Sequence, residues 1–160
     1  MIRPSEISDA ARLAEIYNGY VAASDATFDT EPVSAPDFAE RIREISAHFP
    51  FFVFEDCGKI AGYCYAHAWK QKQAYARTLE TTVYVAPAFV GRGIGESLVR
   101  ALVDECRRRG VRALVACITA GNTPSAKLHE KLGFVKVSHF RCVGEKFGRM
   151  LDVEDFELLL

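Results

Sequence analysis

A glycine-rich segment is the first stretch of this sequence that could do chemistry. Gly91-Arg-Gly-Ile-Gly95 follows a β-branched stretch and precedes one in which apolar residues recur at helical spacing. Glycine lets the backbone adopt positive φ and approach a ligand closely. The first N–H groups of a helix lack intrahelical partners, and the helix dipole favours an anion beside them. The segment therefore predicts a seat for a pyrophosphate.

Three classes of ligand use such a seat. A dinucleotide-binding fold needs GxGxxG near its start, but here Glu96 stands at the last glycine position and the motif is in mid-chain. A P-loop needs a lysine after its last glycine, and none follows Gly95. Coenzyme A is the third class. An ordinary strand-to-helix turn without a ligand remains the alternative.

Glu80 is the second candidate for chemistry. It stands in an otherwise apolar and β-branched stretch, 78–85, which predicts a central strand. Strand alternation places Glu80, Thr82 and Tyr84 on one face. Burial would raise the pKa of the Glu80 carboxyl toward the range of a general base. A glutamate facing solvent at a strand edge is the alternative.

Lysines and cysteines complete the reactive residues. Lys70 and Lys72 alternate along a polar loop, 70–76, so both could face an acceptor with acidic oxygens, or simply face solvent.

Cys64 and Cys117 stand in apolar strands, and we expect them in the core rather than as nucleophiles. The five cysteines show no CxxC spacing, which disfavours a zinc site and a disulfide framework. We expect no metal.

Bulk composition narrows the class of protein. The 160 residues are 49% hydrophobic and 26% charged, as in a globular domain, and the net charge of -1 gives no field for nucleic acid. The basic run 107–109 is expected at a helix end. No stretch reaches the roughly 18 apolar residues of a membrane span, and no signal peptide is visible. We expect one domain, 1–160, in the cytoplasm, with no membrane or nucleic-acid partner.

The expected elements alternate in the manner of an α/β domain. Helices should begin at Ser8-Asp9, whose side chains offer an N-cap, and at Ser34; a third should run from the glycine turn to Gly110. A fourth helix is expected over 122–132. Strands are expected at 2–3, 51–54, 60–69, 78–85, 113–118, 135–143 and 151–160, with a hairpin turn at 56–59. This order predicts a mixed sheet with helices on both faces.

A second motif connects these features to a family. Asn122-Thr-Pro-Ser125-Ala-Lys-Leu128-His-Glu-Lys-Leu-Gly133-Phe134 resembles the second signature of the GNAT acetyltransferase superfamily. The segments Trp69–Val85, Thr27–Pro32 and Val143–Asp152 are similar to the phosphinothricin and methionine sulfoximine N-acetyltransferase branch. The similarity covers nearly the whole chain. It implies the GNAT fold, with a central, mostly antiparallel mixed sheet that opens to admit acetyl-CoA.

The resemblance also implies the cofactor-binding residues. The strand before the turn would bind the pantetheine arm, the turn would bind the pyrophosphate, and the second motif would contribute two further contacts. These residues are Val83, Tyr84, Val85, Gly91, Arg92, Gly93, Ile94, Gly95, Glu96, Asn122 and Ser125. One departure is Val90, where the family pattern has Arg or Gln, so that side chain offers no phosphate contact.

Acceptor and mechanism follow from the same resemblance. Glu80 would act as general base, directly or through a water, in a direct transfer to a small amino-acid-like amine. His129 would protonate the thiolate, or merely pack on its helix. The acceptor-binding residues would be Phe28, Lys70, Gln71, Lys72, Tyr75, Glu80, Thr81 and Thr82. The family also implies a homodimer. The alternatives are acetylation of protein N-termini or lysines, and a non-catalytic coenzyme A-binding module.

Overall fold

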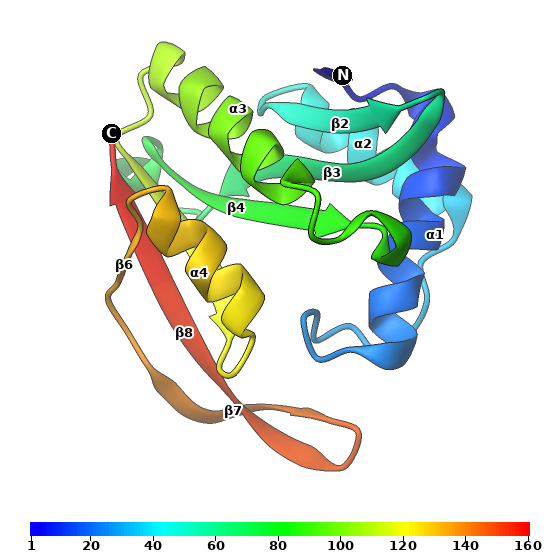
Figure 1. Cartoon of the computed structure of the whole chain (residues 1–160). Helices are drawn as coiled ribbons and strands as arrows, with labels where there is room; N and C mark the ends of the chain where they lie inside the picture. Colours follow the sequence, from blue (N-terminus) through cyan, green and yellow to red (C-terminus); the bar gives the residue numbers. More distant parts are fainter.

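An eight-stranded mixed sheet organises residues 1–160, all of which the computed structural model describes (Figure 1). Along the sheet the strands follow the order β1-β2-β3-β4-β5-β8-β6, and β7 pairs with β8. The strands are β1 (Ile2–Pro4), β2 (Phe51–Asp56), β3 (Lys59–Ala68), β4 (Thr78–Val85), β5 (Ala113–Thr119), β6 (Val135–Lys136), β7 (Phe140–Lys146) and β8 (Arg149–Leu159). The α-helices are α1 (Ala10–Ala23), α2 (Ala35–Ser46), α3 (Ile94–Arg108) and α4 (Thr123–Lys131).

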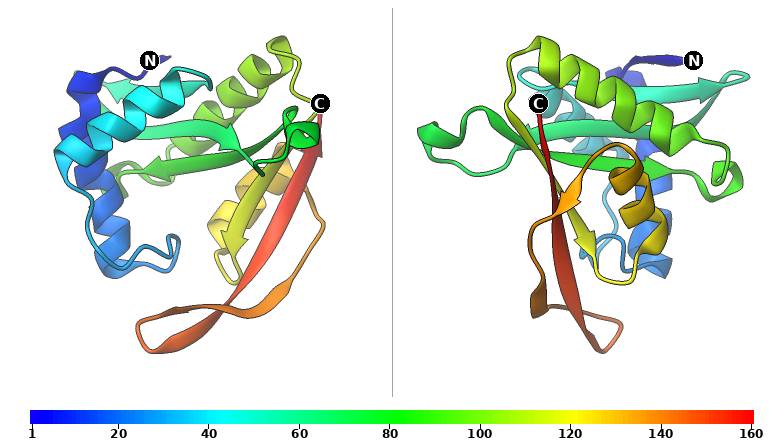
Figure 2. Two further views of the ribbon diagram at one scale, coloured as in Figure 1. Left: turned by 180° about the vertical axis from the view of Figure 1, so that it is seen from behind. Right: turned by 60° about the vertical axis from the view of Figure 1, so that its left-hand side comes forward.

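Helices cover both faces of the sheet, as the sequence predicts (Figure 2). On one face α1 and α2 bury Leu13 and Phe38 against Tyr63 of β3. On the other, α3 buries its apolar stripe, including Leu98 and Leu102, against β3–β5 and β8. Burial of large apolar side chains on both faces is the main source of stability for such a sheet. None of the helices combines the length and apolar character that a membrane crossing requires.

The sheet separates in its middle. Every neighbouring pair of strands is antiparallel except β4 and β5, which are parallel. Their pairing covers only Thr78–Thr81 against Ala113–Ala116. Beyond Thr81, β4 continues along β3 as far as Val85, while β5 continues along β8. The two strands therefore diverge, and the backbone edges that face the gap have no strand partner there.

The C-terminal strands differ from the expectation. Instead of strands at 135–143 and 151–160, the structure has the short β6, then β7, then β8 beginning at Arg149. Phe147 and Gly148 both have positive φ, 53° and 68°, which is the geometry of a two-residue hairpin turn. Phenylalanine is unusual at such a position, so the residue types there carry no turn signal. The hairpin extends beyond the rest of the sheet (Figure 1).

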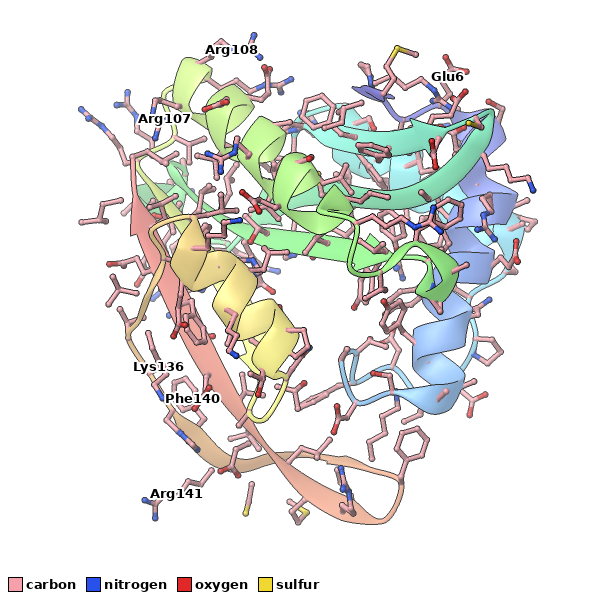
Figure 3. All side chains as sticks on the ribbon, in the orientation of Figure 1. Glu6, Arg107, Arg108, Lys136, Phe140 and Arg141 are labelled. Atoms are coloured by element: carbon pink, nitrogen blue, oxygen red, sulfur yellow. The ribbon has the colours of Figure 1, made fainter.

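Two local interactions at helix ends refine the sequence picture. Asp9 precedes α1 but does not cap it through its side chain; its carboxylate binds the guanidinium of Arg3, with both contacts at 2.9 Å. The predicted helix start at Ser8-Asp9 is therefore confirmed, since Asp9 is the N-cap residue, but the predicted capping by a side chain is wrong. At the C-terminal end of α3, Arg107 and Arg108 point into solvent (Figure 3). Arg107 pairs with Asp104 of the same helix at 3.2 Å, which accounts for its charge without a ligand.

Gly62 of β3 provides a test of the packing beside the gap. A Cβ atom there would lie 2.8 Å from the carbonyl oxygen of Tyr84 and 3.2 Å from Cα of Val85. These are backbone atoms that cannot move aside, so Gly62→Ala should lower the free energy of unfolding by about 1–3 kcal/mol. Urea denaturation measures this change.

Gly19→Ala is the matched control. Gly19 is an exposed glycine of α1, and a Cβ atom added there would have no neighbouring atom within 4 Å. Alanine there should raise the stability by roughly 0.5–1 kcal/mol through helix propensity. A Gly62→Ala variant as stable as the wild type would contradict the packing of β3 against β4.

Candidate active site

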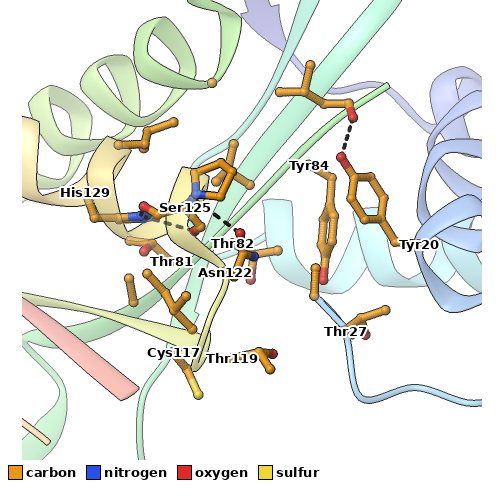
Figure 4. Close-up of a pocket in the computed structure, with 18 of the residues that line it drawn as sticks. Tyr20, Thr27, Thr81, Thr82, Tyr84, Cys117, Thr119, Asn122, Ser125 and His129 are labelled. Atoms are coloured by element: carbon orange, nitrogen blue, oxygen red, sulfur yellow. Dashed lines mark hydrogen bonds between the residues drawn. The ribbon is translucent and has the colours of Figure 1, made fainter. Parts of the chain in front are cut away.

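A cavity of about 430 Å³ occupies the gap between β4 and β5 (Figure 4). It is lined by 22 residues, which come from these two strands, α1 and the loop after it, the segment that leads into α3 and the start of α3, α4 with its N-cap, and β8. In Figure 4, Tyr20, Tyr84 and Thr27 stand on one side, and Ser125 and His129 on the other. The cavity exists because the sheet separates, so it is a consequence of the strand pairing rather than of loose packing.

Strand alternation divides the cavity between the two faces of the sheet. The odd-numbered residues of β4, from Thr81 to Val85, face the side of α3, where Val85 packs against the α3 core. The even-numbered residues, from Glu80 to Tyr84, face the side of α1. Cys117 of β5 shares the Glu80 face, because the parallel pairing sets Glu80 opposite Val115. A ligand in the gap would therefore touch both faces.

The glycine turn borders the α3 side of the cavity. Gly91 and Gly93 have φ of 81° and 74°, a region that favours glycine, and no atom lies within 4 Å of their would-be Cβ positions. Gly95 differs, since a Cβ there would lie 2.9 Å from Leu128 of α4. The first two glycines thus shape an open turn at the start of α3, and the third permits close helix packing. This turn is suited to an anion.

The side chains around the turn offer little to an anion, because they are either uncharged or paired with other charged groups. Val90 is 60% exposed and offers no charge. Arg92 lies 3.9 Å from the Asp56 carboxylate. Glu96 forms ion pairs with Lys131 of α4 at 2.5 Å and with Arg100 at 2.9 Å, which lower the pKa of its carboxyl. Backbone groups are therefore the main anion-binding groups that the turn provides.

Glu80 lies where β4 and β5 part. Its carboxylate lines the cavity and is 30% exposed. Partial burial raises the pKa of Glu80, and the negative charge of Asp155 raises it further. His67 opposes this shift, because its Nε2 lies 3.9 Å from Oε1 of Glu80. A carboxyl group with a raised pKa in the wall of a cavity is a good candidate for a general base.

Cys117 corrects one expectation. We expected it in the core, but it is exposed in the wall of the cavity, whereas Cys64 is fully buried as expected. Partial burial, together with the carboxylates of Asp155 and Glu80, raises the pKa of the Cys117 thiol to about 12. The thiol therefore stays protonated at neutral pH and is a poor nucleophile. The sequence could not show that β5 loses its neighbour at this position.

The second motif forms α4 and its cap. The side chain of Asn122 accepts a hydrogen bond from the N–H of Ser125 at 3.3 Å. His129 is 3% exposed, and its Nδ1 lies 2.8 Å from the carbonyl oxygen of Ser125. Because a carbonyl only accepts, we assign the proton to Nδ1. Burial lowers the pKa of His129, so the ring is neutral at pH 7 and its Nε2 carries no proton to give.

Tyr20 is a cavity residue that sequence reasoning missed. Its hydroxyl donates to the carbonyl oxygen of Val85 at 2.7 Å, and its ring lies 5.0 Å from the ring of Tyr84. Its spacing from the other apolar residues of α1 predicts only a position in the core. Thr27 and Thr119 also line the cavity, and the sequence did not predict them as site residues. Their contribution depends on long-range packing, for which a single sequence carries no signal.

The predicted site residues fall into two groups. Those that line the cavity are Phe28, Glu80, Thr81, Thr82, Val83, Tyr84, Val85, Gly95, Asn122, Ser125 and His129. Those that do not are Lys70, Gln71, Lys72, Tyr75, Gly91, Arg92, Gly93, Ile94 and Glu96. In the loop between β3 and β4, the ammonium group of Lys70 lies 4.1 Å from the centre of the Trp69 ring and 5.4 Å from that of Tyr75.

Comparisons with known proteins agree with this geometry. The model of the Acetyltransferase (GNAT) family matches residues 13–134. The phosphinothricin N-acetyltransferase of Streptomyces viridochromogenes is 35% identical, over 98% of this chain and 88% of its own length. The L-methionine sulfoximine/L-methionine sulfone acetyltransferase of Salmonella typhimurium is 36% identical, over 99% and 94%. A phosphinothricin acetyltransferase from Sinorhizobium meliloti, solved in complex with acetyl-CoA, superposes with a TM-score of 0.97 at 31% identity, over 100% and 88%.

Proposed function

The chain belongs to the GNAT acetyltransferase family, and we propose that it transfers the acetyl group of acetyl-CoA to the amino group of a small amino-acid-like substrate. The substrate class is that of phosphinothricin, methionine sulfoximine and methionine sulfone, by similarity to the relatives named for these compounds. The observation that carries the proposal is the position of Glu80. It lies where β4 and β5 diverge, on the face of the sheet opposite the glycine turn.

The chain's residues fit acetyl-CoA. Past Thr81 the β4 edge is free of β5 and could pair with the amide groups of a pantetheine arm. The open turn at Gly91 and Gly93 could hold a pyrophosphate through its backbone, with Asn122 and Ser125 beside the arm. When bound, acetyl-CoA would supply an activated acetyl thioester. Backbone N–H groups of Val83–Val85 would then stabilise negative charge on the acyl oxygen.

Glu80 removes the proton that makes the acceptor amine unreactive. An amino acid is mostly an ammonium ion at neutral pH, and a positioned base contributes roughly 10²–10⁴-fold to the rate. The raised pKa of Glu80 brings the carboxylate closer to the basicity that this task requires, directly or through a water. The protonated thiol of Cys117 argues for direct transfer without an acyl-enzyme.

The proposed role of His129 changes with the structure. In its neutral ring, Nδ1–H donates a hydrogen bond to the carbonyl oxygen of Ser125, and Nε2 carries no proton. The ring is therefore poorly suited to protonate a thiolate. Its ring packs edge-on against Phe134, with centroids 5.0 Å apart. We assign His129 to the packing of α4, which presents Asn122 and Ser125 to the cofactor.

The acceptor side combines residues inside and outside the cavity. Phe28 and Thr82 line the α1 side together with Glu80. Lys70 and Lys72 lie on the loop that joins β3 to β4, and we propose that they attract acidic acceptors toward the cavity without lining it. Gln71 and Tyr75 are proposed to shape the same loop.

The wider context of the enzyme is also proposed. One acetyltransferase domain spans 1–160, since β1 and β8 at the two ends of the chain belong to one sheet. The five cysteines are free thiols, which suits a reducing cytoplasm. A homodimer is proposed by analogy with the family, and the exposed apolar residues of the C-terminal strands, such as Phe140 and Val143, could contribute.

Acetylation of a peptide N-terminus or lysine is the second candidate. Two observations favour it: Lys70 and Lys72 lie outside the cavity, and Asp155 shares the Glu80 face, where its carboxylate could hold a cationic acceptor. The non-catalytic coenzyme A-binding module is set aside, because the relatives that match nearly the whole chain are named acetyltransferases.

The acceptor class is tested by following free thiol release from acetyl-CoA with a panel of amines. The panel contains phosphinothricin, methionine sulfoximine, methionine sulfone, natural amino acids, and peptides with free N-termini or lysines. We expect turnover with the first three, because they resemble the acceptors of the relatives. Reaction with a peptide but with no amino-acid analogue would overturn the proposal in favour of the second candidate. No reaction with any member of the panel would also overturn the proposed substrate class.

Replacement of the base gives a mechanistic prediction. Glu80→Gln should lower kcat by at least about 10²-fold, the low end for a general base, with unchanged acetyl-CoA affinity. A base works only when deprotonated, so the wild-type kcat/KM should fall as pH decreases through the raised pKa of Glu80. The variant should lack the break at this pKa, and its kcat/KM should follow only the deprotonation of the acceptor amine, which takes place at higher pH.

Glu44→Gln serves as the control, because Glu44 is an exposed carboxylate on α2, away from the cavity. It should leave both the rate and the pH profile as in the wild type. A Glu80→Gln variant with wild-type kcat at neutral pH would remove Glu80 from the mechanism.

A further inference from the structure

A buried lysine joins the C-terminal hairpin to the loop after α1. Lys146, the last residue of β7, is 4% exposed. Its ammonium group donates to the carbonyl oxygens of Ser24 at 2.6 Å and Thr27 at 2.8 Å. These partners lie far away in the sequence, with separations of 122 and 119 residues. The contact therefore fixes a tertiary arrangement rather than a local turn.

The same loop is held from two further sides. Thr119 of β5 donates its hydroxyl to the carbonyl oxygen of Asp25 at 2.6 Å. Tyr17 of α1 forms a hydrogen bond with the Thr27 hydroxyl at 2.8 Å. Arg149, across the hairpin from Lys146, pairs with the Asp25 carboxylate at 3.2 Å. The loop thus spans α1, β5 and the hairpin, and Lys146 is its buried link to the hairpin.

Phe28 packs directly on the hairpin backbone. Gly144 of β7 has no side chain, and a Cβ atom there would overlap the ring of Phe28. Phe28 and Thr27 line the cavity on the Glu80 side of the sheet. The hairpin therefore sets the position of a cavity wall through two adjacent contacts, one polar at Lys146 and one apolar at Gly144.

The chemistry of Lys146 indicates positioning rather than simple packing. A buried ammonium group costs free energy unless its charge and its donors are compensated. Its two hydrogen-bond partners are neutral carbonyls. Burial lowers the pKa of Lys146, and the carboxylates of Asp25 and Asp29 oppose that shift. An apolar side chain of the same length would fill the space without that cost. What the ammonium adds is direction, because it draws two carbonyls of one loop, three residues apart, toward a single point.

We propose that Lys146 is a positioning residue for the acceptor: it holds Thr27 and Phe28 in the wall that the acceptor amine contacts, with Gly144 supplying the space for Phe28. This inference rests on the proposed acetyltransferase function for its kinetic readout. Because the wall lies on the Glu80 face and the glycine turn lies on the other, loss of Lys146 should affect the acceptor and not the cofactor.

The test compares wild type, Lys146→Met and Gly144→Ala in steady-state kinetics. Lys146→Met removes both hydrogen bonds but keeps the apolar stem, and Gly144→Ala displaces Phe28 while leaving the lysine intact. A less ordered wall leaves a smaller fraction of molecules competent to bind the acceptor. Both variants should therefore raise the acceptor KM by at least about tenfold, with the KM for acetyl-CoA within about twofold of the wild type.

Lys136→Met is the matched control. Lys136 of β6 points to solvent (Figure 3) and pairs with Glu154 at 3.1 Å on the surface. It should leave both KM values unchanged. If Lys146→Met raised both KM values equally, or lowered only the melting temperature, Lys146 would be a general stabilising residue and the proposal would be overturned.

A second measurement does not depend on turnover. Amide hydrogen exchange of residues 24–29 in the free protein should be faster in Lys146→Met than in the wild type, while exchange of α3 stays the same. If the wild type acetylates no acceptor, the proposed function fails but this measurement still applies to Lys146. Unchanged exchange at residues 24–29 would overturn the positioning role by itself.

Discussion

The separation of β4 from β5 after Thr81 is the constraint on which the rest of the site depends. Four residue pairs hold the strands together, and beyond them each strand follows its other neighbour. The gap exposes backbone that a closed sheet would use for hydrogen bonds, and such groups are costly unless a ligand, side chain or water satisfies them. Tyr20 satisfies one of them at Val85. The remaining edge is available to a ligand with amide groups.

The same separation gives the site two chemically different sides. Strand alternation turns Glu80 toward α1, while Val85 turns toward α3 and the glycine turn. A ligand that enters from the α3 side meets backbone donors suited to phosphate. An acceptor on the other side meets a carboxylate of raised pKa and a wall held by the C-terminal hairpin. Transfer can then take place within the gap.

Local sequence patterns were sufficient to predict most of the elements, and together with the family resemblance they named half of the residues that line the cavity. The glycine turn, the Glu80 strand and the Asn122 cap carry their signals within a few residues, and the structure brings Glu80 and Asn122 into one cavity. The hairpin turn at Phe147 was missed because phenylalanine is atypical there. Tyr20, Thr27 and the exposure of Cys117 depend on which distant strands pair, so hydrophobic periodicity could not reveal them. Sequence likewise could not place Lys70 and Lys72 outside the cavity.

The central claim, that the gap between β4 and β5 holds the cofactor, is tested most directly by a crystal structure of the protein with coenzyme A. We predict electron density for the pantetheine arm between β4 and β5, with the pyrophosphate at the turn formed by Gly91 and Gly93. A smaller cavity lies between α1 and the segment from Pro87 to Val90. Coenzyme A bound in that cavity, with the gap between the strands empty, would contradict the claim.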